Sequence, residues 1–280
     1  MELVAAAKMR KSVAKVLATR SYSDLLWETV LRMVKLIDLN RHKFFIEKKE
    51  IRKVLVVMIS TNRGLCGSFN LNLLQKVRDS INLHHPESQA TDLITFGSRG
   101  RDEARRRDLK IIADFAKEDV TIDSTSIRPL AHLLIKEFMS GHYEKVFVAY
   151  TDFMSSLQQR PHVKQLLPIV PQIDERLAHI SHQRPEETVD LSQIAEFVFE
   201  PNMTDLLESF LPRLLEVQIY QAVLESEASE HSARMLAMKN ASEAASDMVS
   251  GLTLVYNQAR QAGITAEIAE IAAGSGAWSV

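Results

Sequence analysis

Apolar residues recur every three or four positions at the start of the chain, as in a helix that buries one stripe of its surface. Residues 1–49 contain no Gly or Pro, and eight of ten positions in this spacing are apolar. The ten positions are Ala6, Met9, Val13, Val16, Arg20, Ser23, Trp27, Val30, Val34 and Ile37. Because this is the seam of a coiled coil, the pattern predicts a long helix that packs on a partner helix.

The same spacing returns near the C-terminus, where nine of eleven positions are apolar. They are Leu224, Ala228, His231, Met235, Met238, Ser242, Ala245, Val249, Leu252, Tyr256 and Ala259. One helix over Arg213–Ala273 would be about 90 Å long. Because that exceeds the width of a small domain, we expect much of it to protrude and to pair antiparallel with the N-terminal helix. A helical hairpin that serves only as a scaffold would show the same periodicity.

Between these helices the pattern changes to short apolar runs rich in β-branched residues. Four runs predict strands: Val54–Ile59, Asp92–Phe96, Lys110–Phe115 and Lys145–Tyr150. Helical patterns at Leu71–Leu83 and Ile127–Ser140 separate some of them, so we expect a mostly parallel, Rossmann-like α/β sheet. Residues 168–190 carry three prolines and little periodicity, which indicates a linker or loop.

Composition narrows the class of protein. The chain has 34 Lys and Arg against 36 Asp and Glu, a balance that argues against extensive nucleic-acid binding. A single cysteine, Cys66, excludes an internal disulfide and a metal site built from several cysteines. No apolar run approaches the roughly 18 residues of a membrane span. These features predict a soluble cytoplasmic protein, and we expect neither a metal nor a cofactor.

Four stretches resemble the gamma subunit of F-type ATP synthases, in the order in which that family has them. They are "VAAAKMRK" (4–11), "STNRGLCGSFN" (60–70), "LPRLLEVQIYQAVLE" (211–225) and "SEHSARMLAMKNASEAASDMVSGLTLVYNQARQAGITAEIAEI" (229–271). The resemblance implies a non-catalytic rotor shaft that turns inside a ring of alpha and beta subunits and couples ion flow to ATP synthesis or hydrolysis. It also implies contacts with the epsilon subunit and the membrane c-ring, at the cytoplasmic face of a bacterial plasma membrane.

The resemblance also assigns roles to individual residues. It implies that Lys8, Arg10 and Lys11 meet acidic loops of the beta subunits, and that Arg260 and Gln261 form a hydrogen-bonded catch with a beta-subunit loop. By the residues alone, the basic face is a solvated helix surface. Contacts with the membrane ring are implied for the "FVFEP" motif, residues Phe197, Phe199 and Glu200, although the family commonly has tyrosine at both phenylalanine positions. An edge strand is the alternative for this motif.

Small and flexible side chains on the C-terminal helix suggest a low barrier to rotation. We expect Met235, Met238 and Ala245 to form a bearing surface that interlocks with no neighbour at any one angle.

The sequence "RGLCGS" (63–68) lies between a predicted strand and a predicted helix, where phosphate-binding loops occur. It lacks the Lys-Ser/Thr ending of a Walker A motif, which argues against nucleotide binding. The resemblance implies that Gly64, Cys66 and Gly67 form a structural turn. The alternative function is an α/β enzyme that binds a phosphate ligand at this loop and oligomerises through its helical hairpin. A nucleophilic Cys66 would require a neighbouring histidine.

Three segments are therefore expected: an N-terminal coiled-coil helix (1–49), an α/β domain (50–202) and a C-terminal coiled-coil helix (203–280). Members of the resembled family usually carry about twenty more residues, roughly 30 Å of helix, ahead of the position of Met1. Either the start of the chain was assigned too late or the N-terminal helix is shortened, and a shortened helix would leave Thr253–Ala272 partly unpaired.

Overall fold

The computed structural model describes residues 1–35, 43–48, 50–84, 90–117, 124–170 and 203–277. The chain forms two compact units, Met1–Met235 and Leu236–Val280. Among the described residues, no helix combines the length and the apolar character that crossing a membrane requires.

The first unit is built on a five-stranded sheet with the order β3-β2-β1-β4-β5. The strands are β1 (Lys53–Ile59), β2 (Ala90–Phe96), β3 (Ile111–Phe115), β4 (Lys145–Phe153) and β5 (Gln159–Leu167). The first four pair in parallel, as the four apolar runs predict, and β5 pairs antiparallel with β4. The sequence did not reveal β5 because it carries Pro161 and polar residues, which an edge strand tolerates.

Side chains of β1 alternate between two cores. Leu55, Val57 and Ile59 pack in one cluster, and Val54, Val56 and Met58 pack in the other. Both sets are buried because helices cover both faces of the sheet. The β1 sequence is therefore a continuous apolar run instead of an alternating one.

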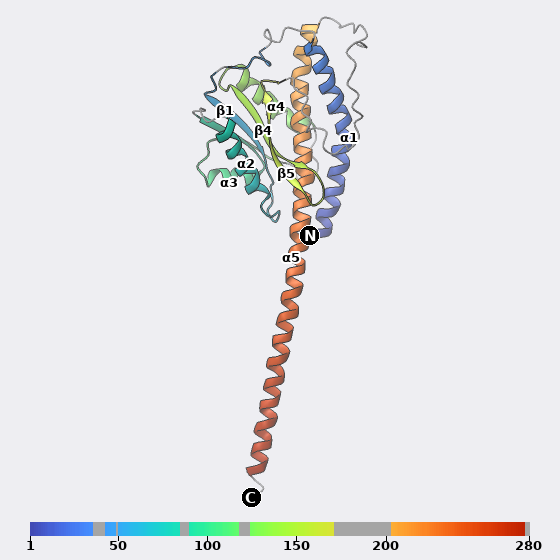
Figure 1. Ribbon diagram of the computed structural model, residues 1–280, viewed down its shortest axis with the longest axis vertical. Coiled ribbons are helices and arrows are strands. Elements are labelled where there is room, and N and C mark those ends of the chain that lie inside the picture. Colours follow the sequence, from blue (N-terminus) through green and yellow to red (C-terminus); the bar gives the residue numbers. More distant parts are fainter. Residues whose placement is uncertain (36–42, 49, 85–89, 118–123, 171–202, 278–280) are drawn as a thin grey trace. The chain divides into compact units, whose positions relative to one another are not determined.

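The helices that cover these two faces come from different parts of the chain (Figure 1). On one face lie α2 (Phe69–His84) and α3 (Ser98–Arg105), whose apolar residues join the cluster of Val54. The other cluster contains residues of α1 (Glu2–Lys35), α4 (Ser124–Met139) and the first part of α5 (Met203–Ala277). The terminal segments thus complete the core of this unit.

The buried side of α1 agrees with the predicted seam at every second position from Val16 to Val30. At most of the other positions, the buried residue is the one just before the predicted residue. Val16, Ser23 and Val30 are buried as predicted, but the residues buried between and around them are Ser12, Leu26 and Met33. Trp27, which the sequence pattern favoured, is only half-buried. Both sets of residues have the same spacing of three and four. At these positions the prediction chose one of two adjacent residues, and the other one is buried.

Helix α1 does not extend through residue 49, so the helical prediction for 1–49 is wrong at its end. Residues 43–45 form a turn. There Phe44 enters the core, with its ring centroid 6.4 Å from that of Phe138, and its carbonyl accepts a hydrogen bond from the Ile169 amide. At this point the chain therefore forms a turn instead of a helix, and the turn places Phe44 between α4 and the end of β5.

Candidate functional site

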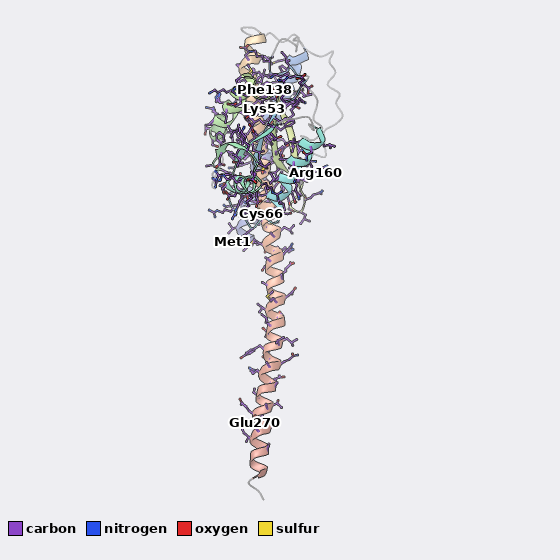
Figure 2. The ribbon with its side chains drawn as sticks, turned by 90° about the vertical axis from the view of Figure 1, so that its left-hand side faces the viewer. Met1, Lys53, Cys66, Phe138, Arg160 and Glu270 are labelled. Carbon is purple, nitrogen blue, oxygen red and sulfur yellow. The ribbon has the colours of Figure 1, made fainter. Side chains whose placement is uncertain are left out.

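The carboxyl end of β1 leads into a loop, residues 60–68, that runs to the start of α2. Its first part is closed by Asn70, whose side-chain oxygen accepts from the Thr61 amide at 3.2 Å and whose nitrogen donates to the Thr61 hydroxyl at 2.8 Å. Figure 2 places Cys66, within this loop, at the same end of the first unit as Met1, whereas Lys53 lies toward the opposite end. The loop therefore lies where the N-terminus of the chain also lies.

Helix α3 supports the loop through a close backbone approach. The Gly100 amide donates to the Ser60 hydroxyl oxygen at 3.0 Å, and a Cβ at Gly100 would lie 2.4 Å from that oxygen. A Cβ at Gly97, where φ is +109°, would lie 2.7 Å from the Ser60 carbonyl oxygen. Glycine is therefore required at both positions for α3 to begin against the end of β1.

The predicted turn residues have different environments. Gly67 has φ of +60°, in the left-handed region, and the non-glycine residue Leu65 has φ of 64°. Gly64 lies outside that region, and its carbonyl faces Arg234. Cys66 is buried, and this burial raises the pKa of its thiol. A thiol with a raised pKa is a poor nucleophile at neutral pH, which argues against the catalytic interpretation of Cys66.

Opposite the loop, four side chains of α5 and Lys117, which follows β3, form a polar group that we call the junction cluster: Lys117, Glu227, Glu230, His231 and Arg234. Lys117 Nζ lies 2.6 Å from Glu230 Oε2, and only 5% and 8% of these two side chains are exposed. Arg234 Nη2 lies 2.8 Å from Glu230 Oε1. Because Lys117 follows β3 and Glu230 belongs to α5, this ion pair joins the sheet to the helix.

Arg234 also holds the loop itself. Its guanidinium donates to the carbonyl oxygens of Gly64 at 3.3 Å and Arg63 at 3.2 Å. One side chain thus contacts Glu230 on its own helix and two peptide groups of the loop. A planar guanidinium with five N–H donors is suited to this arrangement.

The charges of the junction cluster balance. Burial by itself would raise the pKa of Glu230, but the neighbouring Lys117 and Arg234 outweigh it, and the pKa lies below its usual value. The pKa of Glu227 is lowered in the same way: burial opposes the shift, and the hydrogen bond with His231 and the charge of Lys117 overcome it. Two carboxylates therefore remain ionised beside two cationic side chains.

A cavity in the junction has a volume of about 30 Å³ and is lined by Lys8, Asn62 and Arg63 together with the junction cluster. That volume holds about one water molecule, whereas small-molecule sites commonly measure several hundred Å³. The cavity beside Arg63 therefore has no room for the phosphate ligand of the alternative function. The arrangement is mechanical: it fixes a loop and a strand end to a helix.

A second, partly buried polar contact lies earlier on α5, before the junction cluster. Thr19 of α1 donates to Gln221 Oε1 at 2.9 Å, and Gln221 Nε2 donates to Glu225 Oε1 at 3.2 Å. Burial, and then the negative charge of Asp152 on β4, raise the pKa of Glu225 to about 8. One proton is therefore held at a site where α1, α5 and β4 meet.

The remaining predicted site residues are spread along the two terminal helices. Lys8 lines the junction cavity, whereas Arg10 and Lys11 are exposed on α1. Met235, the last residue of the first unit, is half-buried. In the second unit Met238 is half-buried, and Ala245, Arg260 and Gln261 are exposed. Phe197, Phe199 and Glu200 lie outside the described residues.

The junction cluster was not predicted from the sequence. Glu227, Glu230 and Arg234 are spaced three and four residues apart, which places them on one side of α5. This charged stripe overlaps the predicted seam at His231, and the overlap of charged and seam positions could have indicated the cluster. Lys117 could not be found in this way, because it is 113 positions away from Glu230 in the sequence.

Comparisons with known proteins give one consistent result. Residues 1–278 match the ATP synthase family. An ATP synthase gamma chain of Chloroflexus aurantiacus is 38% identical over 99% of this chain and 91% of its own length. Gamma chains of Roseiflexus castenholzii and Pelotomaculum thermopropionicum are 37% and 38% identical with the same coverage.

Solved structures of low sequence identity share the fold. A chain of the Tetrahymena thermophila mitochondrial ATP synthase central stalk and c-ring has a TM-score of 0.61 at 22% identity, covering 86% of this chain and 97% of its own. A chain of the Euglena gracilis mitochondrial ATP synthase, from a structure of OSCP, F1 and c-ring, has a TM-score of 0.59 at 18% identity, with coverage of 97% and 95%.

Proposed function

Because the chain belongs to the ATP synthase gamma-chain family and is the rotor subunit of an F-type ATP synthase, we propose that its two terminal helices form the rotating shaft. In this proposal α1 and α5 wind together as an antiparallel coiled coil, and the sheet domain lies at its base. The second unit of the chain enters the ring of alpha and beta subunits. The single observation that carries the proposal is the exposed apolar surface of that second unit.

The second unit is a helix with large apolar side chains on its surface. Leu252 and Tyr256 are 63% and 65% exposed, and Ile271 is 73% exposed. Residues 236–277 span about 60 Å at 1.5 Å per residue. An exposed apolar surface of this length marks an interaction site in a protein that works inside an assembly. The alpha and beta subunits supply the surface that covers it.

Contacts within the first unit support the antiparallel pairing. Val16 of α1 packs in one cluster with Leu224 and Ala228 of α5, and Thr19 bonds to Gln221. The partner number on α5 falls as the residue number on α1 rises, which is the direction of an antiparallel pair. The buried positions of α1 also keep the alternating spacing of three and four that coiled coils use.

We infer contacts with the beta subunits at two places. Lys8, Arg10 and Lys11 have no ion pair within the described residues, so their charges are available to acidic loops of a partner. Arg260 and Gln261 are exposed on the second unit, as a catch that donates to a beta-subunit loop requires. An exposed pair of opposite charges contributes up to about 1 kcal/mol, which can favour one angle of rotation and remain reversible.

At the base, the protein contacts the epsilon subunit and the membrane c-ring, and it is peripheral to the cytoplasmic face of the bacterial plasma membrane. Phe197, Phe199 and Glu200 provide the c-ring contacts. Met235, Met238 and Ala245 provide the bearing surface. Gly64, Cys66 and Gly67 form the turn that Arg234 fixes to α5.

The protein has no catalytic activity of its own in this proposal, and the active sites belong to the complex. The purified chain should neither bind nor hydrolyse ATP, whereas ATPase activity should appear when alpha and beta subunits are added. Nucleotide hydrolysis by the chain alone that is lost in the Gly64→Ala and Gly67→Ala variants would instead support the alternative enzyme, which binds its ligand at this loop.

The catch is tested by two substitutions of one residue type on the same exposed helix. Gln261→Ala should lower ATP hydrolysis of the reconstituted complex several-fold, and Gln258→Ala should leave it nearly unchanged. Both glutamines are exposed, so the comparison separates the catch from a general surface effect. Equal activity of the two variants would contradict the assignment of Gln261.

A further inference from the structure

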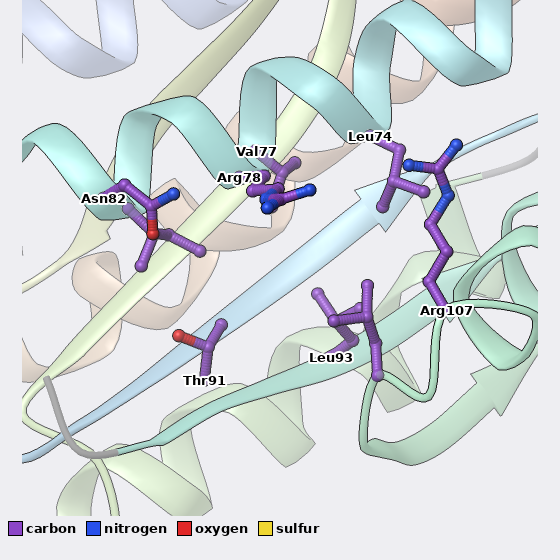
Figure 3. A pocket seen from close by; sticks show the side chains of 9 residues that line it. Leu74, Val77, Arg78, Asn82, Thr91, Leu93 and Arg107 are labelled. Carbon is purple, nitrogen blue, oxygen red and sulfur yellow. The ribbon is translucent and has the colours of Figure 1, made fainter.

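A cleft of about 470 Å³ opens on the face of the sheet that α2 covers. Figure 3 shows Leu74 and Val77 of α2 on one side of it and Leu93 of β2 across from them. These three side chains are buried at the bottom of the cleft, where they form part of the core beneath α2. The volume lies within the range of small-molecule sites, and the floor is apolar.

Two arginines lie at this cleft without a charged partner in the described part of the chain. Arg78 comes from α2 and Arg107 from the turn after α3. Neither guanidinium has an ion pair or a hydrogen bond among the described residues. Neighbouring arginines differ: Arg101 pairs with Asp114 at 2.9 Å, and Arg106 pairs with Glu103 at 3.1 Å. Asp114 and Glu103 therefore pair with these neighbouring arginines.

The cleft is separate from the junction cluster. Thr91, at the start of β2, and Leu109, just before β3, both line it, so it lies toward the amino ends of the parallel strands. Asn82 and Thr91 are drawn toward one end of the cleft, and Arg107 toward the other (Figure 3). Nucleotides in such sheets bind beyond the carboxyl ends of the strands, which is the opposite end.

We propose that this cleft binds a small amphipathic anion, with an alkyl chain against Leu74, Val77 and Leu93 and a carboxylate or phosphate monoester between Arg78 and Arg107. Each guanidinium can donate two parallel hydrogen bonds to either head group. The apolar floor accounts for the alkyl chain, since removing it from water is favourable in proportion to the buried area. The cleft thereby combines charge recognition with an apolar channel.

Calorimetric titration of the full-length chain with decanoate and with decyl phosphate tests this inference. At least one should bind with Kd of about 0.1–1 mM, which is typical of ligands of this size. Decanol, which lacks the charge, and butyrate, which lacks the chain, should each bind at least about tenfold more weakly. Whichever of the two anions binds more tightly identifies the head group.

The Arg78→Gln/Arg107→Gln variant should weaken binding of that anion at least about tenfold. A matched control, Arg105→Gln/Arg106→Gln, removes the same charge outside the cleft and should bind as the unmodified chain does. Ile81→Ser, at the apolar lining, should weaken the alkyl probes and leave circular dichroism unchanged. Absence of binding by both anions, or equal binding by the Arg78/Arg107 variant and the control, would overturn the proposal. None of these results bears on the rotor function.

Discussion

The two parts of helix α5 have the same backbone and opposite surroundings. From Leu206 to Met235 most of its side chains are packed or paired within the first unit: Leu224 and Ala228 are completely buried, and Glu230 is bound by Lys117 and Arg234. Beyond Leu236 nearly every described side chain is exposed, including Leu252 at 63%. One continuous helix therefore changes its environment within a few residues.

The difference indicates which part of the helix is stabilised by the chain itself, and on the proposed function it separates that part from the one that contacts other subunits. The first part is fixed by contacts that the chain makes with itself, so changes there should act on folding. In the second part the apolar residues contribute almost nothing to the isolated chain, because they remain in water. Changes there should act only when alpha and beta subunits are present. Four comparisons of variants, from the largest expected effect on stability to the smallest, test this division.

The buried ion pair should give the largest loss. Glu230→Gln leaves Lys117 buried without its carboxylate and should reduce the free energy of unfolding by about 3–5 kcal/mol. The matched control is Glu243→Gln, which removes an exposed partner of Lys239 at 3.9 Å in the second unit and should cost less than about 0.5 kcal/mol. Urea denaturation of both variants is the measurement. Similar losses would show that the two parts of α5 are not distinct.

Two leucine substitutions give the next comparison. Leu224→Ala removes a completely buried side chain and should cost about 2–4 kcal/mol, whereas Leu252→Ala should change the stability of the isolated chain by less than about 0.5 kcal/mol. Denaturation midpoints give the first result. Leu252→Ala should nevertheless weaken assembly with alpha and beta subunits, measured by co-purification. Normal assembly of this variant would argue against the exposed surface as the ring contact.

Glu225 makes the first part of α5 sensitive to pH. Its pKa of about 8 in the folded protein lies above its ordinary value, so the folded state retains a proton that the unfolded state loses. Stability is therefore lost as the pH rises from about 4.5 to about 8. Glu225→Gln should remove this loss, and its advantage over the unmodified chain should be at least about 1 kcal/mol larger at pH 9 than at pH 5.

Unfolding of Glu225→Gln is compared with that of Glu208→Gln, an exposed position on the same helix, at both pH values. The control should show no pH-dependent difference from the unmodified chain. An advantage of Glu225→Gln that is constant with pH would contradict the assignment of the proton to Glu225.

Bulky residues on the bearing surface should affect stability least. Met238→Trp and Ala245→Trp should change the free energy of unfolding by less than about 0.5 kcal/mol. We expect them to slow ATP turnover of the reconstituted complex several-fold, because a large side chain interlocks with the ring at some angles. Proportional effects on turnover and on melting temperature would indicate simple packing.

Much of this fold follows from local pattern. The apolar runs that became β1, β2 and β4 are buried on both faces, and burial leaves a continuous signature in the sequence. By contrast, β5 is an edge strand, and its polar residues and Pro161 resemble a loop. The α1 stripe was predicted in spacing and misplaced at alternate positions, since periodicity cannot choose between Ser12 and Val13.

The site was less predictable for a physical reason. Family resemblance supplied Lys8 and the exposed catch, but their roles depend on other subunits. Contacts within the chain, such as those of Lys117 with Glu230, join residues whose sequence separation exceeds any local pattern. The Gly97 and Gly100 requirement likewise arises only when α3 is brought against Ser60.

The hydrogen bonds from Arg234 to the loop determine which of the residues involved can change in sequence. Its hydrogen bonds go to main-chain oxygens at positions 63 and 64, and every amino acid supplies such an oxygen. Substitution of these two residues therefore leaves both hydrogen bonds possible, whereas replacement of Arg234 removes them. Selection should act on the donor and leave the acceptors to vary.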